Sequence, residues 1–273
     1  MIAERGPALP TSAFDYDLPA ELIAQEPAAE RGQSRLLIVE RSAGERPAAA
    51  FRDAMFPDFI DLVPPGDLVV LNSTRVRHAR FVGTRESGAP AEVLLLHPGA
   101  DETWIAIGKP GSAMRPGKRI MIGDGAAIAT VAMLEDGNRV VRFEGLDAAT
   151  AIQRFGRLPL PPYIRRDPVD SDERRYQTVY AEREGSVAAP TAGLHFTREL
   201  LAALEHRGVQ LERLDLEVGP GTFRPVESDD PAAHQMHEER YDIPRALADA
   251  VTRTRAAGGH VWAVGTTVVR ALE

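Results

Sequence analysis

Residues 127–143 read Ala-Ile-Ala-Thr-Val-Ala-Met-Leu-Glu-Asp-Gly-Asn-Arg-Val-Val-Arg-Phe, and this stretch indicates the fold of the middle of the chain. Two strand-like runs, Ala127–Leu134 and Arg139–Phe143, flank the dipeptide Asp136-Gly137. Asp-Gly between two such runs is a strong β-hairpin signal, because glycine readily adopts the positive φ that tight hairpin turns require. We therefore predict an antiparallel pair of strands here.

The residues before this hairpin continue the same pattern back to residue 68. Short apolar runs alternate with Gly and Pro, which is typical of an all-β unit. Several short strands at this spacing predict a small barrel or sandwich. The further runs are Leu68–Asn72, Ala79–Arg85, Ala91–His97, Trp104–Ile107 and Arg119–Ile122.

The sequence on either side of the β block has mixed character. Residues 14–65 contain a short helix candidate, Leu18–Gln25, and a strand candidate, Arg35–Glu40. After residue 146, Asp147 is a helix N-cap candidate with Gly156 as the stop, and a proline-rich connector follows at 158–163. From residue 185 onward, expected strands and helices alternate. An α/β unit therefore surrounds an all-β unit.

That alternation has specific markers. Thr197 is expected to cap a helix that ends near Gly208, with Phe196 packing against Leu201. A strand with Leu214, Leu216 and Val218 on one face should follow. Pro244 suits the first turn of a further helix, Val261–Val264 is a strand, and Thr266 or Thr267 opens the last helix.

Composition indicates a globular protein and removes several kinds of chemistry. The chain has 273 residues, of which 44% are hydrophobic and 26% charged, and it contains no cysteine. Disulfides, thiolate nucleophiles and cysteine-ligated metal sites are therefore excluded. There is no run of about 18 apolar residues and no signal-peptide pattern, so we expect a cytoplasmic protein without a membrane.

The charged residues give evidence both for and against a nucleic-acid partner. The net charge of −8 argues weakly against such a partner, although a local basic face binds phosphates even on an acidic protein. Arg75, Arg77 and Arg80 form one cluster, and Arg165, Arg166 and neighbouring arginines form a second. Each cluster is either a phosphate-binding surface or ordinary solvated charge.

Three glycine-containing segments are candidate ligand sites. The segment 185–197, Gly-Ser-Val-Ala-Ala-Pro-Thr-Ala-Gly-Leu-His-Phe-Thr, is small and apolar, ends at a helix N-terminus and carries one titratable group, His195. A tightly packed turn with His195 in the core is the alternative. Gly219-Pro-Gly221 follows an expected strand and is either a close backbone approach to a ligand or a plain turn. Gly265-Thr266 follows another expected strand, and α/β sheets place ligands at such strand ends.

His234 and His237 have the spacing of one helix face and raise the question of a metal. The pattern is not the His-Glu-x-x-His of zinc proteases, and no cysteine is present to complete a site. We expect catalysis or hydrogen bonding there and no metal.

Taken in order, the motifs resemble the S-adenosylmethionine:tRNA ribosyltransferase-isomerase family of queuosine biosynthesis over residues 14 to 273. The opening is Phe14-Asp-Tyr-Asp-Leu-Pro19, with Glu21-Leu-Ile-Ala-Gln25 and Ser34-Arg-Leu-Leu37 after it. Asn72-Ser-Thr-Arg75-Val76 resembles the family's Asn-Asp-Thr-Arg-Val. The remaining matches are Leu158–Ile164, Arg175–Tyr180, Gly185–Thr197, Gly219–Phe223, His234–His237 and Val264–Thr267.

The chain departs from the family pattern in two places. Leu216-Glu217-Val218-Gly219 stands where the family has Leu-His-Val-Gly, and Glu217 is the expected replacement base. The chain stops at Glu273, within a helix that the family continues. We expect the family's C-terminal portion to be missing and apolar surface to be exposed in consequence.

The resemblance implies a fold, a reaction and roles for residues. The fold would be an α/β main domain (1–69 and 146–273) with an inserted all-β, barrel-like domain (70–145). The reaction would move the ribosyl group of S-adenosylmethionine onto 7-aminomethyl-7-deazaguanine at the tRNA wobble position and rearrange it, giving epoxyqueuosine-tRNA, adenine and methionine.

The chain is expected to act as a monomer without metal. Three sets of residues receive roles from their positions in the motifs. The proton-transfer set is His195, with His237 and Glu217 in reserve. The set for S-adenosylmethionine and the base is Thr191, Gly193, Gly219, Gly221, Thr222 and Thr266. The tRNA phosphate set is Arg75, Arg165 and Arg175.

Three alternatives stay open. A non-catalytic RNA-binding module would have basic, aromatic-rich strands, whereas aromatics make up 6% of the chain. A methyltransferase would carry a glycine-rich loop after an early strand. An inactive fragment of the same enzyme is the third.

Overall fold

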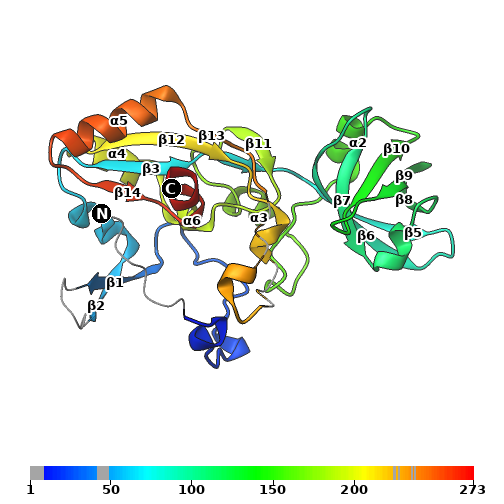
Figure 1. Ribbon diagram of the computed structural model, residues 1–273, viewed down its shortest axis with the longest axis horizontal. Coiled ribbons are helices and arrows are strands. Elements are labelled where there is room, and N and C mark those ends of the chain that lie inside the picture. The colour runs from blue at the N-terminus through cyan, green and yellow to red at the C-terminus, as the bar shows by residue number, and fades with distance from the viewer. Residues whose placement is uncertain (1–8, 42–48, 224–225, 227, 235, 237) are drawn as a thin grey trace.

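The computed structural model describes residues 9–41, 49–223, 226, 228–234, 236 and 238–273. Its larger part is built on a four-stranded sheet in the order β13-β12-β3-β14 (Figure 1). The strands β3 (Leu68–Asn72), β12 (Gln210–Leu216) and β14 (Val261–Ala263) are parallel, and β13 (Tyr241–Asp242) is an antiparallel edge. All five residues of β3 are buried, as expected for a central parallel strand covered on both faces.

The helices cover both faces of this sheet because the side chains of β3 alternate. Val69 and Leu71 pack in one core cluster with Leu204 of helix α4 (Arg198–His206). Leu68 and Val70 pack in another cluster with residues of α5 (Arg245–Ala256) and α6 (Thr266–Leu272). The result is a three-layer α/β body.

Smaller elements complete this body. Strand β4 (Thr74–Val76) runs parallel to β11 (Arg183–Ser186), and β1 (Arg35–Arg41) pairs with β2 (Ala49–Met55) as an antiparallel hairpin. Two short helices are α1 (Phe59–Leu62) and α3 (Asp170–Arg175). Single 3-10 turns lie at Thr11–Phe14, Ala20–Leu22, Phe56–Asp58, Thr191–His195, Pro220–Phe223 and Pro231–Ala233.

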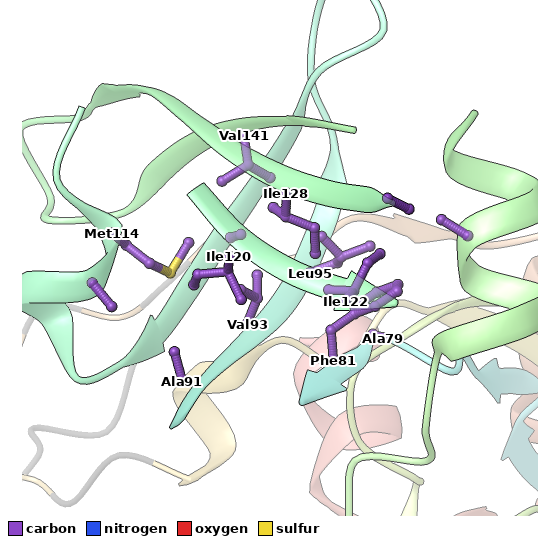
Figure 2. Packing of buried hydrophobic residues seen from close by; sticks show 14 residues of the cluster. Ala79, Phe81, Ala91, Val93, Leu95, Met114, Ile120, Ile122, Ile128 and Val141 are labelled. Atoms are coloured by element: carbon purple, nitrogen blue, oxygen red, sulfur yellow. The ribbon is translucent and has the colours of Figure 1, made fainter. Parts of the chain in front are cut away.

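The middle of the chain forms a separate unit of six antiparallel strands. Pairing runs in the order β10-β7-β6-β5-β8-β9, and β9 pairs with β10 so that the ring closes as a barrel. The strands are β5 (Arg80–Arg85), β6 (Pro90–Pro98), β7 (Trp104–Lys109), β8 (Arg119–Gly123), β9 (Ala126–Met133) and β10 (Arg139–Glu144). The 3-10 turn Gly111–Met114 contributes Met114 to the barrel core, which also holds Phe81, Leu95, Ile128 and Val141 (Figure 2).

Local signals in the sequence correspond closely to this structure. The predicted hairpin is β9–β10, with Gly137 at φ 83° in the turn. Asp147 caps α2 (Ala148–Phe155) by accepting a hydrogen bond from the Thr150 N–H at 2.9 Å. Thr197 caps α4 by accepting from the Leu200 N–H at 3.1 Å. An α/β body with an all-β block is therefore confirmed.

Two expectations were wrong in detail. Leu18–Gln25 contains only the 3-10 turn Ala20–Leu22, and Leu22 is 71% exposed, so no packing supports a helix that short. Leu68–Asn72 belongs to the main sheet and not to the β block, because its register partners are β12 and β14. The barrel strands therefore begin at Arg80, ten residues after the expected boundary at 70.

Within the part of the chain that the structure describes, no helix has the length and apolar character needed to cross a membrane.

Candidate functional site

A cavity of about 340 Å³ lies where four segments of the α/β body meet. The segments are the N-terminal stretch 24–34, the proline-rich connector 160–166, residues 172–176 and the 3-10 turn Thr191–His195. The wall combines aromatic, acidic and basic side chains with His195. The charged and aromatic lining residues are Glu26, Arg31, Tyr163, Arg166, Asp172, Arg175, Tyr176 and His195.

His195 is half-buried and held from two sides. Its Nδ1 lies 3.1 Å from the Ser34 hydroxyl, and its ring centroid is 5.1 Å from that of Phe56. Burial, together with the positive charge of Arg31, lowers the pKa of the imidazole below its ordinary value. A lowered pKa favours the neutral imidazole, which is the form that can accept a proton.

The turn carrying His195 depends on a close backbone contact at Gly193. A Cβ at this position would lie 2.2 Å from the Tyr180 hydroxyl, which is too close for any other residue without a shift. The nearby Gly32 lets the N-terminal stretch approach, since a Cβ there would be 3.2 Å from Cγ2 of Thr197. Glycine thus brings segments from both ends of the chain together around His195.

Arginines tie the cavity wall together. Arg31 donates to the Leu194 carbonyl at 2.8 Å and to the Arg174 carbonyl at 2.7 Å, and burial together with the charge of Arg175 lowers its pKa. Arg175 donates to the Ala29 carbonyl at 3.0 Å. The segment before the first strand is therefore fastened to the rest of the site by hydrogen bonds to main-chain carbonyls.

Arg166 and Asp172 form a two-pronged ion pair in the same wall. The guanidinium reaches both carboxylate oxygens, at 2.5 and 2.9 Å, and the Asp172 side chain is 5% exposed. The hydrogen bonds from Arg166 lower the pKa of Asp172, although burial opposes them. The carboxylate stays ionised at neutral pH.

A second group of predicted residues lies at the carboxyl edge of the parallel strands. The Asn72 side chain accepts from the Leu216 N–H at 3.1 Å and donates to the Leu216 carbonyl at 3.0 Å. The Ser186 hydroxyl contacts the Thr74 hydroxyl at 2.7 Å and accepts from the Val218 N–H at 2.7 Å. This buried network fixes the start of the Gly-Pro-Gly segment.

The carboxyl edge of the sheet extends toward the 3-10 turn that carries His195. The Gly219 N–H donates to Glu239 at 2.8 Å, and Glu239 also accepts from Arg270 of α6 at 2.6 Å. A Cβ on Gly265 would lie 3.2 Å from the Ala192 Cβ, so the corner before Thr266 packs on the turn that carries His195.

The structure brings some of the predicted site residues together and separates others. Thr191, His195 and Arg175 line one cavity. Arg165 lines a second, larger cavity beside the barrel. Gly193 packs against Tyr180, and the residues of the carboxyl edge are Gly219, Gly221, Thr222 and Thr266.

The remaining predicted residues lie elsewhere. The Glu217 carboxylate lies against Gly185 and lines neither of these two cavities. The guanidinium of Arg75 donates to the Ala181 carbonyl at 2.9 Å. His234 is extended after the turn Pro231–Ala233, and His237 falls outside the described residues. Among the residues described, no three His, Asp or Glu side chains are grouped as metal ligands.

Sequence reasoning missed most of the cavity wall. The sequence predicts no role for Arg31 or Asp172, whereas Gln25, Ser34 and Tyr176 lie within family motifs but receive no role from them. Gln25 binds the connector from both sides of its amide, donating to the Tyr163 carbonyl at 3.0 Å and accepting from the Arg165 N–H at 2.7 Å. A buried-looking glutamine or serine inside an apolar motif is the signal that was available.

Comparison with known proteins identifies the family of the chain. A family model described as queuosine biosynthesis protein matches residues 11–273. A crystal structure of S-adenosylmethionine tRNA ribosyltransferase from Thermotoga maritima is 30% identical, with a TM-score of 0.43, covering 95% of this chain and 71% of that one. The S-adenosylmethionine:tRNA ribosyltransferase-isomerase of Paraburkholderia phytofirmans is 47% identical over 269 residues, which are 97% of this chain and 75% of that protein. The enzyme of the same name from Symbiobacterium thermophilum is 48% identical over 266 residues, 96% of this chain and 76% of its own. Because the family model spans nearly the whole chain and these relatives share almost half of its residues, the chain belongs to the S-adenosylmethionine:tRNA ribosyltransferase-isomerase family.

Proposed function

We propose that this chain transfers the ribosyl moiety of S-adenosylmethionine to 7-aminomethyl-7-deazaguanine at the wobble position of tRNA and isomerises it. The products are epoxyqueuosine-tRNA, adenine and methionine. The observation that carries the proposal, in a chain of this family, is that His195 contacts Ser34 in the wall of a cavity that also contains carboxylates and aromatic rings.

The size and lining of the cavity support its assignment to S-adenosylmethionine. Its volume of about 340 Å³ lies within the range of small-molecule sites, roughly 300–1,000 Å³. A sulfonium cation is stabilised by aromatic faces and by carboxylates, and Tyr163, Tyr176 and Glu26 supply both. Thr191 and the backbone near Gly193 would contact the donor from the turn side.

His195 would remove the proton next to the sulfonium. A general base must be unprotonated at the working pH, and the lowered pKa of His195 meets this need. Glu217 and His237 are the reserve assignments, and Glu217 lines a different part of the carboxyl edge. The ring nitrogen Nδ1 is engaged by Ser34, which leaves Nε2 for the reacting proton.

The tRNA would be held by arginines around the site. Arg175 lines the cavity and Arg165 lies on the exposed connector, so both are suited to phosphates. Arg75 would support the site through its bond to Ala181 as well as through charge. The modified base must leave its stack to reach the donor, as in other enzymes that act on a base.

An assay of the purified chain tests the function. We would incubate it with S-adenosylmethionine and tRNA bearing 7-aminomethyl-7-deazaguanine, and measure nucleoside mass and adenine release. The expected result is epoxyqueuosine and adenine in equal amounts, with neither formed on tRNA carrying guanine at that position. Adenine release without a change in nucleoside mass would contradict ribosyl transfer.

A further inference from the structure

A second cavity, of about 860 Å³, separates the barrel from the proline-rich connector. One wall is formed by strands β6 and β7 of the barrel and the other by residues 159–167, with Pro220 at its margin. Its apolar floor includes Leu94, Ile107 and Pro162. The cavity thus lies between the two units of the molecule and is not the site that contains His195.

The basic residues that line this cavity differ in whether they form ion pairs. Arg80 donates to both oxygens of Glu92, at 3.1 and 2.7 Å, and lies 3.7 Å from Asp167. Arg166 is paired with Asp172. Lys109, on β7, and Arg165, on the connector, are exposed and form no ion pair within 4.0 Å among the described residues. Hydrogen bonds from Arg80 to both Glu92 oxygens lower the pKa of that carboxyl, and the charge of Lys109, which faces Glu92 in the strand register, helps to lower it.

Two cations without an ion pair of their own, on opposing walls of a groove, suit an anion that passes between them. A single RNA strand presents such an anion at every nucleotide, together with sugar and base faces that pack on apolar side chains. We propose that this cavity binds the sugar–phosphate backbone of the tRNA strand beside the reacting nucleotide, with Lys109 and Arg165 on phosphates. This inference rests on the proposed function, and it makes the barrel one wall of the RNA site.

The position of the connector explains how an RNA strand in this cavity would place a nucleotide near the proposed reaction site. Leu160, Pro161, Ile164 and Arg166 line both this cavity and the one with His195, so the two share a wall. A backbone held in the larger cavity can therefore deliver a flipped base across that wall. Gln25 fixes the connector in place through its bonds to Tyr163 and Arg165 main-chain atoms.

The test is tRNA binding by the Lys109→Ala/Arg165→Ala variant across a series of salt concentrations. An unmodified tRNA transcript serves as the probe, so that binding is measured without turnover. We expect affinity to fall about tenfold and the slope of log K against log salt to shrink by about 1.4, because each single-strand phosphate contact contributes about 0.7. The matched control is Lys118→Ala/Arg142→Ala, which removes the same charge from exposed barrel positions outside the cavity.

Unchanged affinity and slope in the cavity variant would overturn the inference, as would an equal loss in the control, which would indicate a diffuse field. An intact chain that binds no tRNA would overturn it too. The thermal unfolding midpoint verifies that both variants are folded. Failure of the proposed function is distinguishable, because it leaves tRNA binding intact while the unaltered chain releases no adenine. In an active chain, the cavity variant should raise KM for tRNA and leave KM for S-adenosylmethionine unchanged.

Discussion

At the scale of single residues, the environment of His195 sets what it can do. Partial burial penalises its charged form, and Arg31 adds electrostatic repulsion to an imidazolium. Ser34 meets Nδ1 and limits ring rotation. These interactions come from residues more than 150 positions away, so the environment of His195 is a tertiary effect.

The pH dependence of turnover follows from this arrangement. A general base acts unprotonated, so if His195 is the proposed base, kcat/KM should rise with pH through its folded pKa, which burial and Arg31 lower, and then level off. His195→Ala should lower kcat by about 10²–10⁴-fold, the usual contribution of a general base, and remove this acidic limb. A pH–rate profile of adenine release measures both.

Two variants sharpen this test. Arg31→Gln should move the acidic limb to higher pH, because the positive charge that opposes protonation of His195 is gone. His206→Ala, at the exposed end of α4, should leave rate and limb unchanged. An unchanged acidic limb in His195→Ala would assign the proton transfer to another group.

At the scale of elements, buried polar groups hold the carboxyl edge of the sheet. Ser186 is fully buried and joins three elements, because it ends β11, contacts Thr74 of β4 and accepts from the Val218 N–H after β12. These strands also pair by main-chain bonds, and Arg77 donates to the Ser186 carbonyl at 3.0 Å. Side-chain and main-chain bonds together position the Gly-Pro-Gly segment.

Replacement of Ser186 by Ala should destabilise the protein. The buried Val218 N–H would lose its partner, and the Thr74 hydroxyl would keep only its interaction with Asp215. A buried group left unsatisfied costs about 1–3 kcal/mol. Urea unfolding gives the free energy directly. Ser87→Ala, in an exposed turn, is the matched control and should change it by less than about 0.5 kcal/mol. A Ser186 variant as stable as the control would mean that water replaces the lost hydroxyl.

At the scale of the whole molecule, the barrel is nearly self-contained. Its core cluster draws only on residues 79 to 155, including Ala151 and Phe155 of α2. Its chain ends lie side by side, since Arg80 and Arg157 exchange main-chain hydrogen bonds at 3.1 and 2.7 Å. Val187 of the α/β body packs against Leu96 and Ile105 at the junction. We infer that the barrel and the α/β body are separate domains.

Residues 78–158 expressed alone should therefore fold. We expect one cooperative thermal transition, because the core and both chain ends are complete within this range. Ile128→Ala, in the core, should cost about 2–5 kcal/mol. Val131→Ala, at a position 49% exposed on the same strand, should cost far less. A broad, non-cooperative transition of the parent fragment would show that the α/β body is needed for folding.

Interactions between residues close in the sequence allow several elements to be predicted from the sequence alone. The β9–β10 hairpin follows from Asp136-Gly137, and helices α2 and α4 begin after the capping residues Asp147 and Thr197. Each depends on neighbours within a few positions, where turn geometry and capping bonds act. The ordered set of motifs also identified the family, and with it the reaction to test.

Only the tertiary structure decided which distant segments meet. Leu68–Asn72 reads as one more strand of the β block, but its residues pair with β12 and β14. The site around His195 joins residues 163 positions apart through the bond from Arg31 to the Leu194 carbonyl, while Glu217 lies away from that cavity. Spacing along the chain reports the periodicity of one element. It does not show which elements bury their side chains against one another or form hydrogen bonds together. These contacts determine which elements pack together.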